Sequence, residues 1–413
     1  MTTLDAATAA PIYDPYWPEA MFDPRELYAT MHEQGPVHYL PEYDAWAVSG
    51  FEALWQIARD TKNFHFTSGA PPNCGLLREP AGASFVHLPN AAYRPRRQVL
   101  APAYRKSSAD VDEPYIRQVA GSVLASVLAR GDGRMDVFAD YTSRVTSRIA
   151  GYKVGLPDED AEYVRGLCDV NLARTPGQKG STPQNLAGVG EAHRYLHDLV
   201  TRARRDPAQA RGDLAALLEA RIDGEPLTDE QIVADLIAIM ITGSETTEIG
   251  AAATIYYLAE HPEQLAEVQA DHSLIPAAFL ETLRYDHPTD LLLREVLQEV
   301  EVAGVTMKPG QPVIMMWGAA NRDPAEFPNP DVYDIHRRYK RHLLFGSGQH
   351  KCLGEFLALR MGAVILEEFF TAIADYTVDV ANCTRKSAEF VKGFNSVPIT
   401  YALTATARRA VRM

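Results

Sequence analysis

The ten residues 345–354 read FGSGQHKCLG and contain three glycines and a single cysteine, Cys352. Glycine permits positive φ values and close backbone approach, and the sequence GEFLALRMGAVILEEFF, which starts at Gly354, predicts a helix directly after the sulfur. Because N–H groups at a helix N-terminus stabilise an anion, this setting favours a thiolate. A thiolate without a second cysteine nearby in the sequence indicates a metal held by one protein ligand, although an isolated cysteine is more often a small buried hydrophobe.

The composition is that of an ordinary globular protein, with 413 residues of which 46% are hydrophobic and 23% charged. The formal net charge of −14 argues against nucleic acid as a partner. The four cysteines, at positions 74, 168, 352 and 383, include no CxxC pair and predict neither a zinc site nor a disulfide framework. Residues 1–17 have no basic start and no apolar run, so we expect no membrane association and a cytoplasmic location.

No repeat or low-complexity linker divides the chain, so residues 1–413 are predicted to form a single domain. The segments 37–40 and 45–48 flank a turn and predict a β-hairpin. Helical patterns dominate from about residue 110 to 375. Further short strands are expected near 300–305, near 312–316 and after Tyr376. The fold class is therefore predicted to be mainly α with a minor β part.

A long helix is predicted to begin after Thr228, where a capping box with Gln231 fixes its start, and to end near Ala259. Its pattern changes at residues 241–248, ITGSETTE, which place Gly243 among hydroxyl and carboxyl side chains. We expect a distortion of the helix there, because Ser and Thr can bond back to the backbone. A buried carboxylate at such a distortion indicates an active site; the alternative is an exposed polar face.

Taken with these patterns, FGSGQHKCLG resembles the haem-binding loop of the cytochrome P-450 superfamily, Phe-Gly-x-Gly-x-(His/Arg)-x-Cys-x-Gly, with every specified position filled. The resemblance implies the cytochrome P-450 fold, with haem b held between the long central helix and the helix after the cysteine loop. It implies that Cys352 is the metal ligand and that His350 bonds a haem propionate. Phe345, beside the sulfur, and Gly354 are the other expected cofactor-binding residues of this loop.

A second motif, ETLR at residues 281–284, resembles the Glu-x-x-Arg motif of the same family. On its own, an i,i+3 ion pair is a common feature of helix surfaces. The resemblance implies a buried pair of Glu281 and Arg284 that is completed by an arginine from the segment before the haem loop, which we assign to Arg337. The expected role of the three residues is structural.

A third motif, TGSETT, resembles the family's (Ala/Gly)-Gly-x-(Asp/Glu)-Thr-Thr, which lies above the iron where oxygen binds. Glu245 and Thr246 match the catalytic acid and alcohol that pass protons to dioxygen. That role requires a carboxylate linked to solvent and a hydroxyl that can hold water. Thr242 replaces the usual Ala or Gly at the first position of the motif, so the groove over the haem is expected to be narrower or more polar.

The resemblance implies further cationic partners for the haem carboxylates. Arg294, in LLLREV, is one of them. Arg96 matches the arginine of the family's His-x-x-x-Arg, but Ala92 stands where the histidine is expected. Tyr93 and Arg94 are the candidates to replace that contact.

Substrate contacts in the family come from four segments, which here are residues 68–88, 239–246, 290–293 and 393–397. The pocket residues predicted within them are Thr242, Leu291, Leu292 and Phe394. Their side chains suggest a small to medium hydrophobic substrate, although each is equally compatible with ordinary core. Arg78 would favour an acidic substrate if its loop folds inward.

The implied function is that of a monomeric haem-thiolate monooxygenase that uses dioxygen to hydroxylate, or O-dealkylate, a hydrophobic molecule. Because 413 residues leave no room for a reductase domain, electrons are expected from a separate ferredoxin or flavodoxin. Two basic clusters are expected to form its docking face: Arg94, Arg96, Arg97, Arg105 and Lys106, and Arg337, Arg338, Lys340 and Arg341. The alternatives are a peroxide-driven haem-thiolate enzyme, a haem sensor or carrier, and a helical protein with a structural cysteine.

Overall fold

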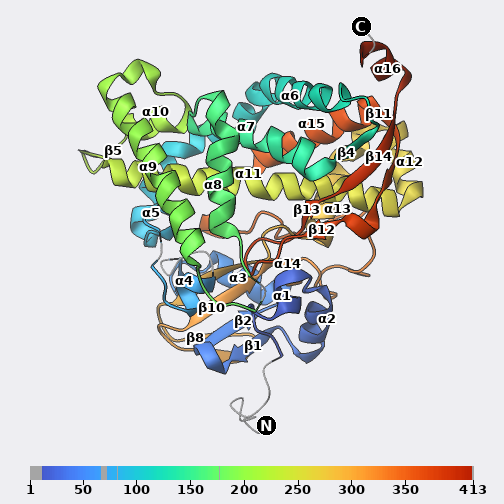
Figure 1. The fold of residues 1–413 in the computed structure, drawn as a ribbon. Coiled ribbons are helices and arrows are strands. Elements are labelled where there is room, and N and C mark those ends of the chain that lie inside the picture. The colour runs from blue at the N-terminus through green and yellow to red at the C-terminus, as the bar shows by residue number, and fades with distance from the viewer. Residues whose placement is uncertain (1–11, 67–71, 81, 176, 412–413) are drawn as a thin grey trace.

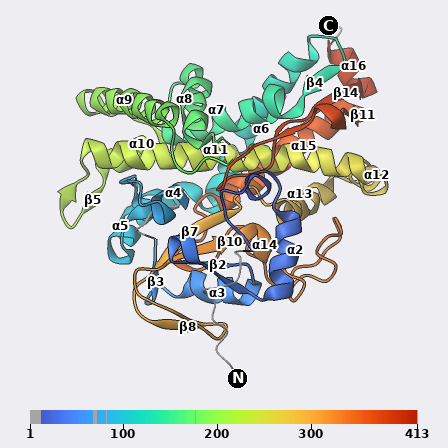
Figure 2. The ribbon, with the colours of Figure 1, turned by 60° about the horizontal axis from the view of Figure 1, so that its bottom comes forward.

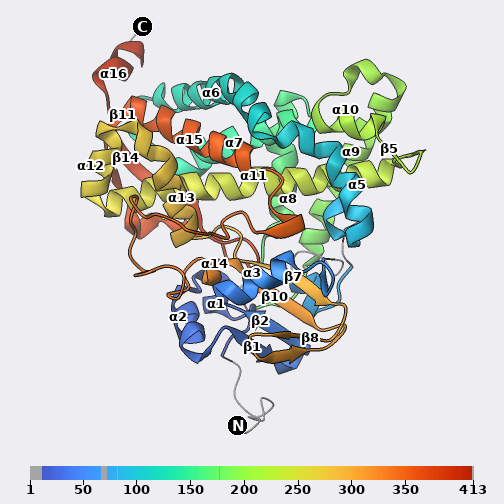
Figure 3. The same cartoon turned by 180° about the vertical axis from the view of Figure 1, so that it is seen from behind.

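The computed structural model describes residues 12–66, 72–80, 82–175 and 177–411. A five-stranded sheet with short helices occupies the lower part of the molecule in Figure 1, and the long helices lie above it. The N-terminal end of the chain lies on the sheet side and the C-terminal end on the helical side, as the view from behind also shows (Figure 3). Residues 1–11, part of the segment expected to lack a targeting signal, and residues 68–71 and 81 of the expected substrate loop lie outside the described residues.

The helices form two groups. The helical part contains α5 (Asn90–Leu100), α6 (Lys106–Leu128), α7 (Ser143–Val154), α8 (Ala161–Leu172), α9 (Pro183–Arg205), α10 (Gly212–Glu219), α11 (Asp229–Glu260), α12 (Pro262–Ala270), α13 (Ile275–Tyr285), α15 (Glu355–Ala372) and α16 (Ala405–Val411). Shorter helices accompany the sheet: α1 (Pro18–Phe22), α2 (Arg25–Gln34), α3 (Phe51–Arg59), α4 (Pro72–Leu76) and α14 (Trp317–Ala320). The fold is thus mainly α with a minor β part, as predicted.

The five-stranded sheet has the order β1 (Val37–Leu40), β2 (Ala45–Val48), β10 (Pro312–Met316), β7 (Leu291–Val296) and β3 (Phe64–His65). The predicted hairpin is confirmed, because β1 and β2 pair antiparallel with Leu40 opposite Ala45. A three-stranded sheet joins β11 (Ile373–Val378), β14 (Pro398–Leu403) and β4 (Arg134–Asp136). The remaining strands form two-stranded ladders: β5 (Arg221–Ile222) with β6 (Glu225–Pro226), β8 (Val300–Val302) with β9 (Val305–Met307), and β12 (Thr384–Arg385) with β13 (Phe394–Ser396).

Three buried apolar clusters organise these elements. The largest runs through the helical part, with members on α6, α7, α11 and α15. The other two pack on opposite faces of the five-stranded sheet. Val313 and Met315 of β10 belong to one, and Ile314 and Met316 to the other, as the alternation of side chains along a strand requires.

The long helix α11 is confirmed, and it crosses the middle of the molecule between the sheet side and the other long helices (Figure 2). Thr228 is its N-cap, and the capping box with Gln231 is present: the Thr228 hydroxyl accepts from the Gln231 N–H at 3.3 Å, and the Gln231 side chain accepts from the Thr228 N–H at 3.0 Å. The helix packs against α7, α8, α9, α13 and α15. Most of its side chains are therefore buried.

The predicted distortion of α11 at residues 241–248 is wrong, because the helix is continuous through Gly243. The hydroxyls of Thr242 and Ser244 each donate to the carbonyl four residues earlier, at 2.8 Å. Thr246 makes the same type of bond to the Thr242 carbonyl at 3.4 Å. These local bonds satisfy the hydroxyl groups without interrupting the helix.

The segment before the cysteine loop is held by a buried ion-pair network on α13. Arg284 donates to both carboxylate oxygens of Glu281, at 2.9 and 2.7 Å, and both side chains are fully buried. Arg337 approaches the same carboxylate at 3.2 Å, and Tyr339 donates to it at 2.6 Å. The three motif residues therefore lie together, and Arg337 also donates to backbone carbonyls of residues 328, 329 and 332, which fixes that segment.

Helix α5 directs its successive arginines to different places. Arg96 is buried and donates to Asp235 of α11 at 2.9 Å and to the Gln231 carbonyl at 3.0 Å. The structure does not support its prediction as a cofactor-binding residue, because its guanidinium is occupied by α11. Arg97, next in sequence, bonds the Lys351 carbonyl at 2.6 Å. Residues that follow one another in a helix lie about 100° apart, which explains the difference.

None of the described helices is both long enough and apolar enough to cross a membrane.

Replacing Arg96 with alanine should lower the free energy of unfolding by about 3–5 kcal/mol at pH 8, because Asp235 is then buried without its cation. Burial, opposed by Arg96, raises the pKa of Asp235 to about 6. At pH 5 the carboxyl carries a proton with or without Arg96, so the loss of stability should be smaller there. Urea titrations followed by circular dichroism at both pH values test this.

The matched control for that measurement is Arg94→Ala, on the same helix, because the Arg94 side chain is exposed. Its effect should stay below about 1 kcal/mol at both pH values. Equal losses for the two variants, or a loss for Arg96→Ala that does not depend on pH, would contradict the assignment of Arg96 to the interface with α11.

Candidate active site

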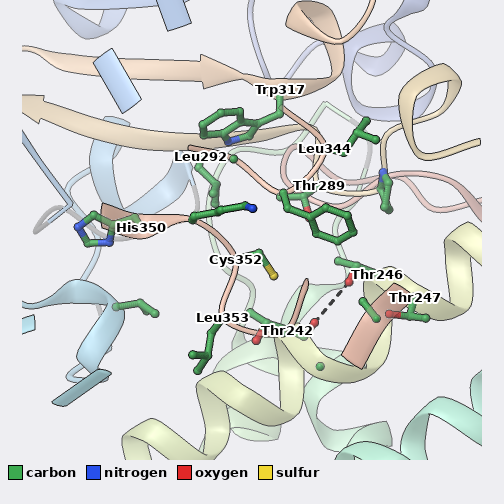
Figure 4. Close-up of a pocket in the computed structure, with 18 of the residues that line it drawn as sticks. Thr242, Thr246, Thr247, Thr289, Leu292, Trp317, Leu344, His350, Cys352 and Leu353 are labelled. Carbon is green, nitrogen blue, oxygen red and sulfur yellow. Dashed lines mark hydrogen bonds between the residues drawn. The ribbon is translucent and has the colours of Figure 1, made fainter. Parts of the chain in front are cut away.

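A cavity of about 280 Å³ lies between α11 and the loop that precedes α15. The Cys352 side chain points into it from the loop, and Thr242 and Thr246 face it from α11 (Figure 4). Thr289 and Leu292 line it at the start of β7, and His350 lies to one side of the sulfur (Figure 4). The cavity thus brings together the cysteine loop, the start of β7 and the TGSETT segment of α11, which lies more than a hundred residues before Cys352 in sequence.

The backbone of the cysteine loop fixes the position of the sulfur. The Cys352 N–H donates to the Phe345 carbonyl at 2.9 Å, which closes the loop. Gly348 has a φ of +72°, and a Cβ on it would lie 2.4 Å from the Ala58 carbonyl oxygen at the end of α3. A side chain at this position would be strained and would collide with backbone, so only glycine lets the loop lie against α3.

The loop alone does not favour a thiolate, contrary to the prediction. Burial raises the pKa of the Cys352 thiol, and the N–H of Gly354 opposes this only in part. The helix also begins at Glu355, so the sulfur lies three residues before the first helical residue. Coordination to a metal deprotonates a thiol, so a metal bound in the cavity would supply the thiolate.

Arg97 and Arg294 line the cavity near His350, and Arg97 is bonded to the cysteine loop. Arg294 of β7 is buried, donates to its neighbour's carbonyl at 2.9 Å and lies over the Phe66 ring at 4.3 Å. Burial lowers the pKa of Arg294 to about 9. His350 lies between the rings of Tyr93 and Phe66, with centroids 4.0 and 5.2 Å away. Burial, followed by the charges of Arg294 and Arg97, lowers the pKa of His350 to about 3.

These groups fit the two carboxylates of haem. Among the described residues that line the cavity, Glu245 is the only acid, and Lys386 neutralises it. Arg97 and Arg294 have no carboxylate partner among the described residues, so they can pair with a dianion that enters the cavity. The cavity also offers one thiol for an axial ligand.

Of Ala92 and its two successors in sequence, only Tyr93 lines the cavity. Ala92 and Arg94 are exposed, whereas Tyr93 is buried and lines the cavity. The Tyr93 hydroxyl accepts from Arg97 at 2.6 Å and lies 3.3 Å from the Gln349 carbonyl. Tyr93 thereby holds Arg97 against the cysteine loop, and Arg97, unlike Arg96, lines the cavity.

The acid and alcohol of α11 both line the cavity. Glu245 is buried, and one of its carboxylate oxygens pairs with Lys386. Burial raises the pKa of Glu245, and Lys386 opposes that rise. Thr246 is half-buried and can release its weak 3.4 Å bond to the Thr242 carbonyl. A hydroxyl with this freedom can bond a ligand or a water molecule in the cavity.

Two of the four predicted pocket residues line the cavity and two do not. Thr242 and Leu292 do. Leu291 packs instead in the apolar cluster on the far face of the sheet. Phe394 of β13 packs on Tyr256, with ring centroids 4.3 Å apart. The placement of Leu291 was readable from sequence, because Arg294 faces the cavity and alternate strand residues share a face.

Other lining residues were missed. Phe390 and Val391 lie just before the predicted segment 393–397, and Thr289 just before 290–293. Nothing in the sequence distinguishes these from core residues, since only the loop geometry turns them inward. Arg78 is largely exposed and lies 3.9 Å from Glu295, so it does not enter the cavity.

The sequence and the fold were compared with known proteins. The family model of cytochrome P-450 matches residues 186–373. Cytochrome P-450 123 of Mycobacterium tuberculosis is 32% identical over 392 residues, which cover 94% of this chain and 96% of the relative. Vitamin D3 dihydroxylase of Streptomyces griseolus is 29% identical over 417 residues, covering 96% of this chain and 100% of the relative.

Solved structures agree in fold. CYP108D1 from Novosphingobium aromaticivorans superposes with a TM-score of 0.83 at 23% identity, covering 94% of this chain and 97% of the other. CYP109E1 from Bacillus megaterium, solved with testosterone, gives 0.83 at 24% identity, with coverage of 93% and 99%. The similarity to relatives over nearly their whole length and the matching fold agree with a cavity lined by a thiol and an acid–alcohol pair. The chain belongs to the cytochrome P-450 family.

Proposed function

We propose that this cytochrome P-450 is a haem-thiolate monooxygenase that inserts oxygen into a small to medium hydrophobic molecule, by hydroxylation or O-dealkylation. The observation that carries the proposal is that Cys352 and Thr246 face a single cavity, which Glu245 also lines. Bound haem b supplies the iron at which dioxygen is activated with electrons from a donor. The protein supplies the ligand, the carboxylate contacts, the protons and the shape of the pocket.

Each group of residues has a distinct role in this proposal. Cys352 would be the protein ligand of the haem iron, and Phe345 and Gly354 would shape the loop around it. Arg97, Arg294 and His350, with Tyr93 behind Arg97, bind the haem carboxylates. Glu245 and Thr246 pass protons into the cavity, where Thr246 holds water near the reacting oxygen. Glu281, Arg284 and Arg337 keep the segment before the loop in place.

The lining of the cavity supports an uncharged hydrophobic substrate. Apolar side chains of Ile239, Leu292, Phe390 and Val391 lie on it, and threonines supply the nearby hydroxyls. The described cations of the lining gather around His350 and the cysteine loop, where they serve the cofactor. A carboxylate substrate would therefore lack a cation of its own. The relatives named for vitamin D3 and solved with testosterone handle such molecules.

The electron donor is proposed to be a ferredoxin or flavodoxin that docks near the cysteine loop. Only some members of the two predicted basic clusters have side chains that are exposed and not already paired with an acid. Arg96, Arg97 and Arg337 point inward, and Arg341 is paired with Glu52 and Glu326. The exposed cations that can meet an acidic partner are Arg94, Arg105, Lys106, Arg338 and Lys340.

The reduced, carbon monoxide-bound protein should show the strongly red-shifted Soret band of a haem thiolate, and Cys352→Ala should abolish that band. Cys383→Ala is the matched control, since Cys383 does not line the cavity, and it should retain the band. A colourless purified protein, or a band that survives in Cys352→Ala, would contradict the assignment.

Thr246→Ala should keep haem and electron consumption while diverting electrons to peroxide. The fraction of electrons that reach product should fall by about tenfold or more, because proton delivery then lacks its hydroxyl. Product and peroxide are measured together against donor oxidised. Thr254→Ala, on the same helix but outside the cavity lining, is the control. Full coupling in Thr246→Ala would refute the role.

Arg338→Glu should slow reduction by a ferredoxin at low salt, and the difference from the parent should shrink as salt is raised. Stopped-flow reduction at several salt concentrations measures both effects. Arg205→Glu, at the exposed end of α9, is the control. Reduction kinetics that are the same for Arg338→Glu and the parent would rule out docking at this cluster.

A further inference from the structure

Five charged side chains from three parts of the chain form one buried group, which we call the Glu245 cluster. Its members are Glu245 and Glu248 of α11, Arg165 and Asp169 of α8, and Lys386, which follows β12. Glu248 lies three residues after Glu245 and so faces the same side of α11. Charges of both signs in this cluster act on the pKa of Glu245, the acid of the proposed catalytic pair.

The contacts within the cluster are specific. Lys386 Nζ pairs with one oxygen of Glu245, while the other oxygen, which is buried, has no partner among the described residues. Arg165 bridges Glu248 and Asp169, the latter at 2.7 Å. The second oxygen of Glu248 accepts from the Thr146 hydroxyl of α7 at 3.0 Å. Each carboxylate therefore has a cation in contact, but Arg165 serves two of them.

The cluster has three carboxylates and two cations. Burial raises the pKa of Glu245, of Glu248 and of Asp169, and the cations oppose each rise. The buried Cys168 thiol, which also lies in this field, has its pKa raised to about 12 and stays neutral. The ionisation state of Glu245 therefore depends on the cation that contacts it, which is Lys386.

The side chains of the cluster differ in their exposed fraction. The Glu245 side chain is 3% exposed, Lys386 is 18% exposed, and Asp169 is 33% exposed. The side chain of Glu248 is fully buried, and that of Arg165 is only 10% exposed. Lys386 is thus the member that contacts Glu245 and is itself partly exposed.

We propose that Lys386 is a positioning residue for proton delivery: it keeps Glu245 ionised between turnovers and connects it to water, so that Glu245 can take up each proton that it then passes to Thr246. The inference rests on the proposed function, in which Glu245 is the acid. The step moves one proton at a time from water to the Glu245 carboxylate and from there into the cavity. No other bond is made or broken by Lys386.

The segment that supplies Lys386 is well fixed. The Lys386 N–H donates to the Gly393 carbonyl at 2.8 Å, and the Lys386 ammonium lies 5.6 Å from the centre of the Phe138 ring. The preceding Arg385 donates to Asp286 through its two terminal guanidinium nitrogens, at 2.8 and 2.7 Å. Lys386 is therefore held in place by its neighbours and not by Glu245 alone.

The test compares Lys386→Met with Lys386→Arg in the haem-loaded protein. Without the cation, burial acts unopposed, so the pKa of Glu245 should rise by about one to three pH units. The infrared difference spectrum of Lys386→Met minus parent at pH 7 should contain an added C=O stretch of a protonated carboxylic acid. That band should disappear when Glu245→Gln is combined with Lys386→Met, and it should be absent in Lys386→Arg.

Turnover supplies the second readout. The pH at which coupling of electrons to product is half-maximal should move upward by about one to three units in Lys386→Met and return to the parent value in Lys386→Arg. A merely structural lysine would not move this midpoint. Lys386→Gln, which is neutral but keeps a hydrogen-bond donor, should behave like Lys386→Met and replaces it if the methionine variant does not fold.

An unchanged infrared spectrum together with an unchanged midpoint in either neutral variant would overturn the proposal for Lys386. Failure of the proposed function looks different. If Glu245→Gln alone leaves coupling intact, Glu245 is not the proton donor, whereas the added acid band still decides whether Lys386 sets its ionisation.

Discussion

Burial of a carboxylate inside a long apolar helix is the constraint on which the cavity depends. Helix α11 runs through the core for 32 residues, and Glu245 lies near its middle, almost without exposure. A buried carboxylate is costly unless a cation and hydrogen bonds compensate. The chain meets this requirement with Lys386, which is 141 residues away in sequence. The C-terminal segment is therefore tied to the centre of the fold.

Charge on the other side of the cavity follows the opposite rule. There Arg97 and Arg294 are held by backbone carbonyls and aromatic rings instead of by carboxylates. Positive groups left without acids in a protected place have lowered pKa values, as Arg294 shows. The two ends of the cavity thus differ in a simple way: the acid near the alcohol is already neutralised, and the cations near the cysteine loop can still bind an anion.

The sequence was most informative where a pattern depends on local chemistry. The capping box at Thr228, the β1–β2 hairpin and the positive φ of Gly346 and Gly348 each follow from neighbouring residues, and the structure has all three. It was least informative where the direction of a side chain depends on packing against residues far away in sequence. Arg96 looks suited to a propionate until Asp235 is known to lie beside it, and the inward direction of Arg97 becomes evident only in the structure. The partner of Glu245 could not be found either, because nothing near Lys386 in sequence marks it.

The contact between Gly348 and α3 has a consequence for how the two parts of the molecule can vary. The cysteine loop lies so close to the Ala58 carbonyl that there is no space for a methyl group between them. The end of α3 therefore limits how far the cysteine loop can shift toward it. A chimera that takes its first 66 residues from one relative and its remainder from another inherits this limit from one parent and the sulfur from the other. The two parents must agree at this single point of contact, however different their pockets are.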